Sequence, residues 1–260
     1  MELGLSSYTY PWAVGISGFM PEKPMNIPEL IQKVKAFGLN RLQICDNISF
    51  ETLPEPEDLP KNFQMEIGTR RLEKANLLKH LAICKKYNST FLRVVIDDSD
   101  FHPSENQVID IIRSVIHDFK DANIILAIEN HDRFTVETLV NIITKTDKDF
   151  VGICLDTANS LGAGEGIKEV VKGLAPYTIN LHVKDFKISR LSHKMGFLVD
   201  GCPTGEGMLN IPYVLQELEK YKRCISATLE VWSSPTSLIE ETIKIEEKWA
   251  SNSIKYVQSI

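Results

Sequence analysis

Short runs of aliphatic and β-branched residues alternate along the chain with segments whose apolar residues recur every three or four positions. The runs indicate strands at residues 3–8, 39–45, 64–70, 90–97, 124–130, 151–157, 178–183 and 226–232. The helical spacing predicts helices at 27–38, 71–87 and 106–121, from 135, near 167–174, and at 212–221 and 237–257. The runs at 124–130, 151–157, 178–183 and 226–232 carry almost no charge until their last residues, as is typical of strands buried on both faces of a parallel sheet.

Eight strands alternating with helices predict an α/β protein of the (β/α)₈ TIM-barrel class, and 260 residues suit one such barrel. We expect a single domain over residues 1–260, because no linker or low-complexity segment divides the chain. The second helix is shortened, since three prolines between residues 54 and 60 allow at most a short turn. The loop after the seventh strand, residues 184–210, is long, irregular and rich in glycine, and could fold over a site as a lid.

Composition narrows the choice of partners and compartment. With a net charge of −6 and no run of Lys or Arg, we expect no nucleic-acid partner. The five cysteines form no CxxC pair, which indicates buried thiols in a reducing compartment. The N-terminus lacks the basic start and apolar core of a signal peptide, and no run reaches the roughly 18 apolar residues of a membrane span. We therefore expect a cytoplasmic protein with no membrane partner, and leave a homo-oligomer open.

Four of the predicted strands end in an acidic or imidazole side chain. These residues are Glu129, Asp156, His182 and Glu230. Parallel strands would bring them to the C-terminal mouth of the barrel, where three carboxylates repel one another unless a cation lies among them. The pattern predicts one divalent metal ion, with Mn²⁺ as first choice for this oxygen-rich set and Mg²⁺, Co²⁺, Fe²⁺ or Zn²⁺ as alternatives. The competing interpretation is an ion-pair network of Glu129 and Asp156 with Lys184 and Arg133.

Three further residues are candidates for substrate binding. Arg93 lies inside an apolar strand, and a buried arginine needs an anionic partner, either a substrate group or Glu66 on the neighbouring strand. His131 follows Glu129 by two positions and Lys184 follows His182 by two, so strand alternation would point them to the same side as the cluster. Trp12 and Phe197 could line a pocket.

The segments AIENH, CLDTANS, NLHVKDF and LEVW, with GEG at residues 205–207, resemble the sugar phosphate isomerase/epimerase superfamily of xylose isomerase-like TIM barrels. The resemblance covers nearly the whole chain. It implies that the Glu, Asp, His and Glu named above bind one divalent metal. It also places Glu206 of the GEG segment among the substrate-binding residues.

Two positions depart from the ketose 3-epimerases of that superfamily. Asn159 stands where those enzymes often have a histidine, and Lys184 and the more distant Arg190 stand where they carry an arginine. We count all three as candidate substrate-binding residues. The SYTYPW start and the MGFLVDGCPTGEG loop look more like a branch associated with sugar-acid catabolism and decarboxylation of a 3-oxo sugar acid.

The leading functional prediction is a metal-dependent isomerase or epimerase of a small ketose or sugar derivative. A divalent ion on the carbonyl stabilises an enediolate, while Glu129 and Glu230 act as the catalytic pair that removes and returns a proton. The alternative is a lyase that decarboxylates a 3-oxo sugar acid, for which Arg93, Lys184 and Arg190 supply cations. An endonuclease of the endonuclease IV type needs more histidines at strand ends than the six in this chain provide. Nothing in the residues favours a non-enzymatic sugar-binding protein.

Overall fold

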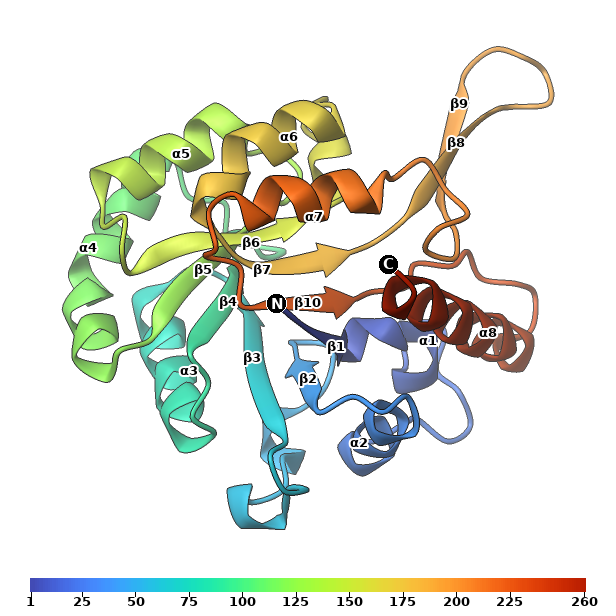
Figure 1. Cartoon of the computed structure of the whole chain (residues 1–260), viewed down its shortest axis with the longest axis horizontal. Helices are drawn as coiled ribbons and strands as arrows, with labels where there is room; N and C mark the ends of the chain where they lie inside the picture. Colours follow the sequence, from blue (N-terminus) through green and yellow to red (C-terminus); the bar gives the residue numbers. More distant parts are fainter.

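The computed structural model describes residues 1–260 and forms a closed barrel of eight parallel strands (Figure 1). The strands are β1 (Glu2–Ser6), β2 (Arg41–Ile44), β3 (Gln64–Arg70), β4 (Phe91–Val95), β5 (Ile125–Glu129), β6 (Val151–Asp156), β7 (Thr178–Val183) and β10 (Ser226–Leu229). They follow one another around the barrel in chain order, and β10 closes it against β1. The predicted α/β TIM-barrel fold is confirmed.

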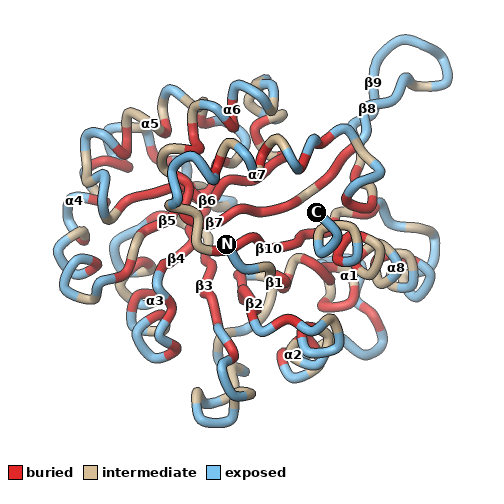
Figure 2. The backbone as a smooth tube through the Cα atoms, viewed as in Figure 1, coloured by how far each residue is buried: buried red, intermediate tan, exposed pale blue.

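Helices surround the barrel and present their apolar faces to it. They are α2 (Ile27–Ala36), α3 (Lys74–Lys86), α4 (Glu105–Ala122), α5 (Val136–Lys145), α6 (Ile167–Leu174), α7 (Ile211–Glu219) and α8 (Ile239–Gln258). Figure 2 shows the consequence, with buried strands at the centre and exposed outer helix surfaces. No helix of the chain is long and apolar enough to cross a membrane.

Local sequence explains several helix boundaries and the weak second connection. Ser104 caps the start of α4 in a capping box with Gln107. The residue that follows α4, Asn123, caps its end with a φ of 54° in the left-handed region. After β2 the chain forms only two 3₁₀ turns, Phe50–Thr52 and Pro56–Asp58, as its prolines predict. A short helix, α1 (Pro11–Val14), was not predicted from the sequence.

The segment after β7 is more regular than predicted. It contains an antiparallel hairpin of β8 (Phe186–Arg190) and β9 (Phe197–Gly201), which projects from the barrel (Figure 1). The prediction of an irregular segment is therefore wrong for these residues. Gly201 anchors the base of the hairpin, because a Cβ there would lie 1.9 Å from atoms of Trp232, so only glycine permits this approach.

Strand pleating separates an apolar layer from a polar barrel interior. Leu42 and Ile44 of β2 point outward into a core cluster of 51 buried residues between strands and helices. The alternate side chains, Arg41 and Gln43, point inward, and both make polar contacts there. TIM-barrel interiors are usually filled by bulky branched side chains, so this polar interior marks the part of the fold that carries chemistry.

Candidate metal centre and active site

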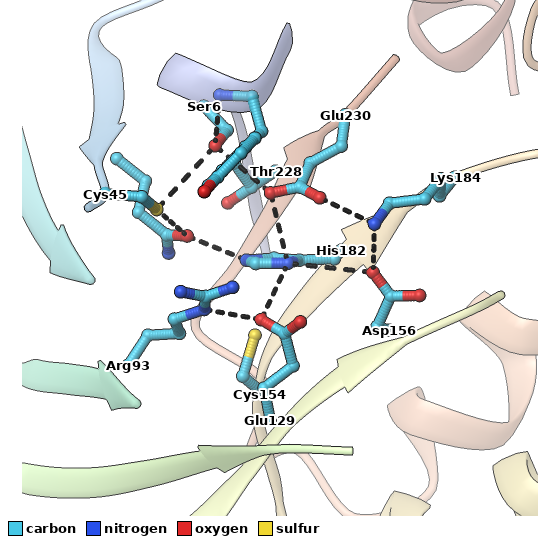
Figure 3. Close-up of polar contacts among 12 residues, drawn as sticks. Ser6, Cys45, Arg93, Glu129, Cys154, Asp156, His182, Lys184, Thr228 and Glu230 are labelled. Carbon is cyan, nitrogen blue, oxygen red and sulfur yellow. Dashed lines mark hydrogen bonds and ion pairs between the residues drawn. The ribbon is translucent and has the colours of Figure 1, made fainter. Parts of the chain in front are cut away.

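The strand ends bring the four predicted metal-binding residues together inside the mouth of the barrel (Figure 3). His182 Nδ1 lies 3.3 Å from Glu129 Oε2, 3.3 Å from Glu230 Oε1 and 3.9 Å from Asp156 Oδ2. All four side chains are buried. Register explains part of this arrangement, because Asp156 and His182 are direct partners in the β6–β7 ladder.

The arrangement fits a metal ion. His182 Nδ1 is buried and has no hydrogen-bond partner, although it faces carboxylates, while Nε2 lies 2.7 Å from Gln43 Oε1. Asp156, His182 and Glu230 offer ligand atoms within 4.8 Å of one another, and so do Glu129, Cys154 and His182. An orphaned imidazole nitrogen among carboxylates is a ready cation position, and one nitrogen with several oxygens suits Mn²⁺, Mg²⁺ or a similar ion.

Cys154 was not predicted to lie at this site. Its Sγ donates to Asn180 Oδ1 at 3.2 Å, and burial followed by the nearby Glu129 carboxylate raises the thiol pKa well above its usual value. A thiol held protonated in this way is a weak metal ligand in the structure as it stands.

Lys184 is a cation at the edge of the cluster, and it also lines the cavity described below. It follows β7 directly, and its Nζ lies 2.9 Å from both Asp156 Oδ2 and Glu230 Oε2. Burial lowers the pKa of Lys184, but the Asp156 and Glu230 carboxylates outweigh it and raise the pKa, so the side chain is an ammonium ion. Burial acts to raise the pKa of Glu230, yet the Lys184 ammonium and the Arg93 guanidinium lower it below its usual value. Glu230 is therefore an ionised carboxylate and a weak base.

Arg93 is buried as predicted, but its partner is different. Its Nε forms an ion pair with Glu129, and its Nη1 lies 3.5 Å from Asp46 Oδ1. Glu66 instead pairs with Arg41 at 2.7 Å. The proposed pairing of Arg93 with Glu66 is therefore wrong, because β4 directs the guanidinium toward the mouth and β2 supplies a second arginine to Glu66.

The competing ion-pair interpretation is half right. Lys184 pairs with Asp156, but Arg133 pairs with Asp97 at 2.7 Å and takes no part in the cluster. Asn159, on the turn after β6, donates from Nδ2 to Glu129 Oε1 at 2.8 Å, and its backbone N–H donates to Asp156 Oδ1 at 2.8 Å. Asn159 thus holds two of the clustered carboxylates.

The other candidate substrate-binding residues lie apart from these contacts. Strand β5 ends at Glu129, so alternation does not extend to His131, whose Nδ1 lies 2.8 Å from Asp132 at the surface. Arg190 lies on the hairpin, where its guanidinium stacks 4.2 Å from the ring centre of Phe197. Phe197 is exposed there and does not line the pocket described below.

Glu206 is exposed, and the GEG segment around it has a structural explanation. The buried Asp185 carboxylate accepts backbone N–H bonds from Gly205 at 2.9 Å, Gly207 at 3.0 Å and Leu209 at 3.0 Å. Asp185 therefore fixes the loop between the hairpin and α7. Its position in NLHVKDF, just past a strand end, was the available signal.

A cavity of about 390 Å³ opens beside Lys184 and Glu230. Tyr8, Trp12 and Trp232 contribute aromatic walls, so the predicted role of Trp12 is consistent with its position. This volume is within the range of small-molecule sites, roughly 300–1,000 Å³. The cavity reaches the cluster from its Glu230 side.

Two polar residues at the site were missed in the sequence. Ser6 donates from Oγ to Glu230 Oε1 at 3.1 Å, and Gln43 contacts His182. Each is a buried polar side chain beside an outward-facing leucine of its strand, Leu5 or Leu42, and this alternation was the available signal.

Comparisons with known proteins agree with the fold. The chain is 28% identical to a 3-oxo-isoapionate decarboxylase of Pectobacterium atrosepticum, over 99% of this chain and 95% of that protein. A solved D-psicose 3-epimerase, 14% identical, superposes with a TM-score of 0.69 over 99% of this chain and 97% of that one.

A barrel protein from Mycobacterium smegmatis, solved in complex with magnesium and 12% identical, superposes with a TM-score of 0.68 over 98% of this chain and 97% of that one. Residues 2–260 match the family described as xylose isomerase-like TIM barrel. The chain therefore belongs to the xylose isomerase-like TIM barrel family, in which these decarboxylase and epimerase relatives are enzymes.

Proposed function

We propose that this protein is a metal-dependent lyase that decarboxylates a small 3-oxo sugar acid. The observation that carries the proposal is that both glutamates available for proton transfer are ion-paired, Glu129 with Arg93 and Glu230 with Lys184. Each carboxylate is therefore already engaged by a cation, whereas decarboxylation requires no carboxylate to remove a C–H proton. The full-length similarity to a 3-oxo-isoapionate decarboxylase supports the same choice.

Glu129, Asp156, His182 and Glu230 are the residues proposed to hold one divalent ion, with Mn²⁺ as first choice. When bound, such an ion supplies a Lewis acid that draws electron density from a substrate carbonyl oxygen. The clustered carboxylates and the orphaned His182 Nδ1 support this assignment.

The remaining steps are bond cleavage, stabilisation of the negative charge that develops, and protonation of the product. In a 3-oxo acid the bond between C2 and the carboxylate carbon breaks, its electron pair moves toward the 3-oxo oxygen, and CO₂ leaves. Lys184, as an ammonium ion beside the cavity, stabilises the negative charge that develops on the remaining fragment. C2 then takes up a proton from solvent, which gives a product one carbon shorter. Trp12 and Trp232 restrict the water that reaches the site.

A second candidate function is an isomerase or epimerase of a small ketose. The observation in its favour is that Glu129 and Glu230 approach His182 Nδ1 at equal distances of 3.3 Å, so they could lie on two sides of one substrate carbon. Structural similarity to a D-psicose 3-epimerase supports this candidate at the level of fold. Asn159, in place of a histidine, weakens it.

The deciding experiment incubates purified protein and Mn²⁺ with 3-oxo sugar acids and with ketoses, in H₂O and in D₂O. We expect stoichiometric CO₂ release from an acid, with deuterium only in the shortened product. We expect Glu230→Gln to retain part of this activity if it still binds metal, because no proton abstraction is needed. Isomerisation of a ketose with deuterium beside the carbonyl, no CO₂ from any acid, and loss of exchange in Glu230→Gln would overturn the proposal in favour of the second candidate.

A further inference from the structure

The interior of the barrel beneath the cluster contains a chain of buried polar contacts that no step above uses. It begins at Arg41, whose guanidinium Nη1 lies 2.7 Å from Glu66 Oε1. It continues from Glu66 to the side-chain amide of Gln43, and Gln43 contacts His182. A buried ion pair is rarely more stabilising than apolar side chains of similar size, so its presence here calls for another explanation.

The contacts of Gln43 determine which way its amide points. Its Nε2 donates to Glu66 Oε2 at 3.3 Å and to Asn180 Oδ1 at 3.2 Å. Asn180 has its own orientation fixed, because its Nδ2 donates to the Ser226 backbone carbonyl oxygen at 3.2 Å, which can only accept. The reversed amide would bring the Gln43 carbonyl oxygen against two other oxygens. The carbonyl oxygen Oε1 must therefore face His182.

A carbonyl oxygen only accepts hydrogen bonds, and Gln43 Oε1 lies 2.7 Å from His182 Nε2. His182 Nε2 must carry the hydrogen atom. Nδ1 is then the nitrogen whose lone pair faces the carboxylates of Glu129 and Glu230. The hydrogen bond made by one ring nitrogen thus decides which nitrogen is available to a metal ion.

We propose that Gln43, held by Glu66, is a positioning residue that fixes the tautomer of His182 so that Nδ1 is free to bind the metal. This inference rests on the metal site of the proposed function, but not on which reaction the site performs. Gln43 reaches no cavity that would hold substrate, so it acts only through His182.

The first measurement is the nitrogen NMR spectrum of ¹⁵N-histidine-labelled protein, without metal and with diamagnetic Zn²⁺. His80 provides an internal contrast, because its Nδ1 lies 2.8 Å from the Asn76 carbonyl oxygen and must carry the hydrogen. We expect a protonated Nε2 for His182 and a protonated Nδ1 for His80. His80→Gln identifies the His80 signals. A His182 Nε2 without hydrogen would overturn the proposal, and the metal-free spectrum tests it even if the proposed function is wrong.

The second measurement is the dissociation constant for Mn²⁺ in variants of β2. Gln43→Met keeps the approximate volume but cannot accept from Nε2–H, so we expect binding about 10–100-fold weaker. Gln43→Glu retains an oxygen that accepts from Nε2–H and should keep most of the affinity. Leu42→Met, which points outward from the same strand, is the matched control and should bind as wild type.

Weak binding by Gln43→Met with recovery in Gln43→Glu supports the proposal. Wild-type affinity in Gln43→Met, or equal loss in Gln43→Met and Gln43→Glu, would overturn it. If Gln43→Met does not fold, Gln43→Glu and the wild-type spectrum still decide the question. The cobalt absorption spectrum provides a further readout, since a changed ligand nitrogen alters the coordination of Co²⁺ even where affinity is retained.

Discussion

Replacing Lys184 by methionine removes the cation that lies 2.9 Å from both Asp156 and Glu230. Without metal, the two carboxylates lose their compensation, and breaking a buried pair in this way costs about 3–5 kcal/mol. Because the Lys184 side chain is 13% exposed, we take the lower end, about 3 kcal/mol. For a chain of this size that corresponds to a fall in Tm of roughly 6–12 °C.

In the Lys184→Met variant, we expect Mn²⁺ to bind more tightly while the decarboxylation rate falls. Saturating Mn²⁺ should restore most of the lost Tm, because the metal ion replaces the missing positive charge. The affinity for Mn²⁺ should rise, since a competing cation is gone. Decarboxylation should nevertheless fall by about 10–150-fold in kcat/KM, the loss of one charged hydrogen bond of about 1.5–3 kcal/mol.

The assays are thermal unfolding with and without Mn²⁺, metal titration, and CO₂ release. Lys187→Met is the matched control, because Lys187 is an exposed lysine on β8 three positions further along the chain. The reasoning is refuted if Lys184→Met loses the same Tm with and without Mn²⁺ and keeps wild-type kcat/KM. Lys184 would then be a structural counter-charge only.

Three further predictions concern single residues. Asp156→Ala should lose stoichiometric Mn²⁺, measured by metal analysis, whereas the surface variant Asp132→Ala should retain it; equal metal content in the two would exclude Asp156 as a ligand. Arg93→Met leaves Glu129 buried without its partner, so the free energy of unfolding of the metal-free protein should fall by about 3–5 kcal/mol, measured in urea; an unchanged urea midpoint would contradict this. Burial raises the pKa of Glu246 to about 8, so the folded protein binds the proton more tightly than the unfolded chain, and stability due to this group is present below pH 4.5 and is lost as pH rises toward 8. Glu246→Gln should therefore flatten the fall in urea midpoint between pH 5 and 8, and a wild-type pH slope in that variant would show that another group is responsible.

The strand ends explain why the cluster could be predicted from the sequence. Parallel strands in a barrel share one C-terminal rim, so residues that end four buried runs must meet there without any knowledge of tertiary contacts. The same reasoning does not place His131, because strand β5 stops at Glu129 and the alternation ends with it, so a substrate-binding role for His131 stays a prediction.

The hydrophobic pattern of the sequence could not predict the contacts of long side chains or the presence of exposed strands. The partner of Arg93 depends on which of several carboxylates its guanidinium reaches, and spacing along the chain does not contain that information. The hairpin of β8 and β9 is exposed on most of its length, so it lacks the apolar alternation by which half-buried strands are recognised. Gln43 was overlooked because β2 has only four residues, which is too short for the alternation of Arg41 and Gln43 with Leu42 and Ile44 to be recognised.

The charge balance of the cluster links its stability without metal to its choice of substrate. Three carboxylates of the proposed metal site face two permanent cations, Arg93 and Lys184. Asp46, beside Arg93, is balanced by Arg70 at 3.3 Å, so the net charge is −1 when His182 is neutral. A divalent ion would change this to +1. The metal-free barrel therefore tolerates its buried carboxylates, and the loaded site attracts an anion. A neutral ketose has no charge to interact with the positive metal-bound site, whereas the carboxylate of a sugar acid would neutralise it. Arg93 and Lys184 therefore have two effects. Their ion pairs stabilise the buried carboxylates when no metal is bound, and their positive charges favour an acidic substrate when the metal is bound.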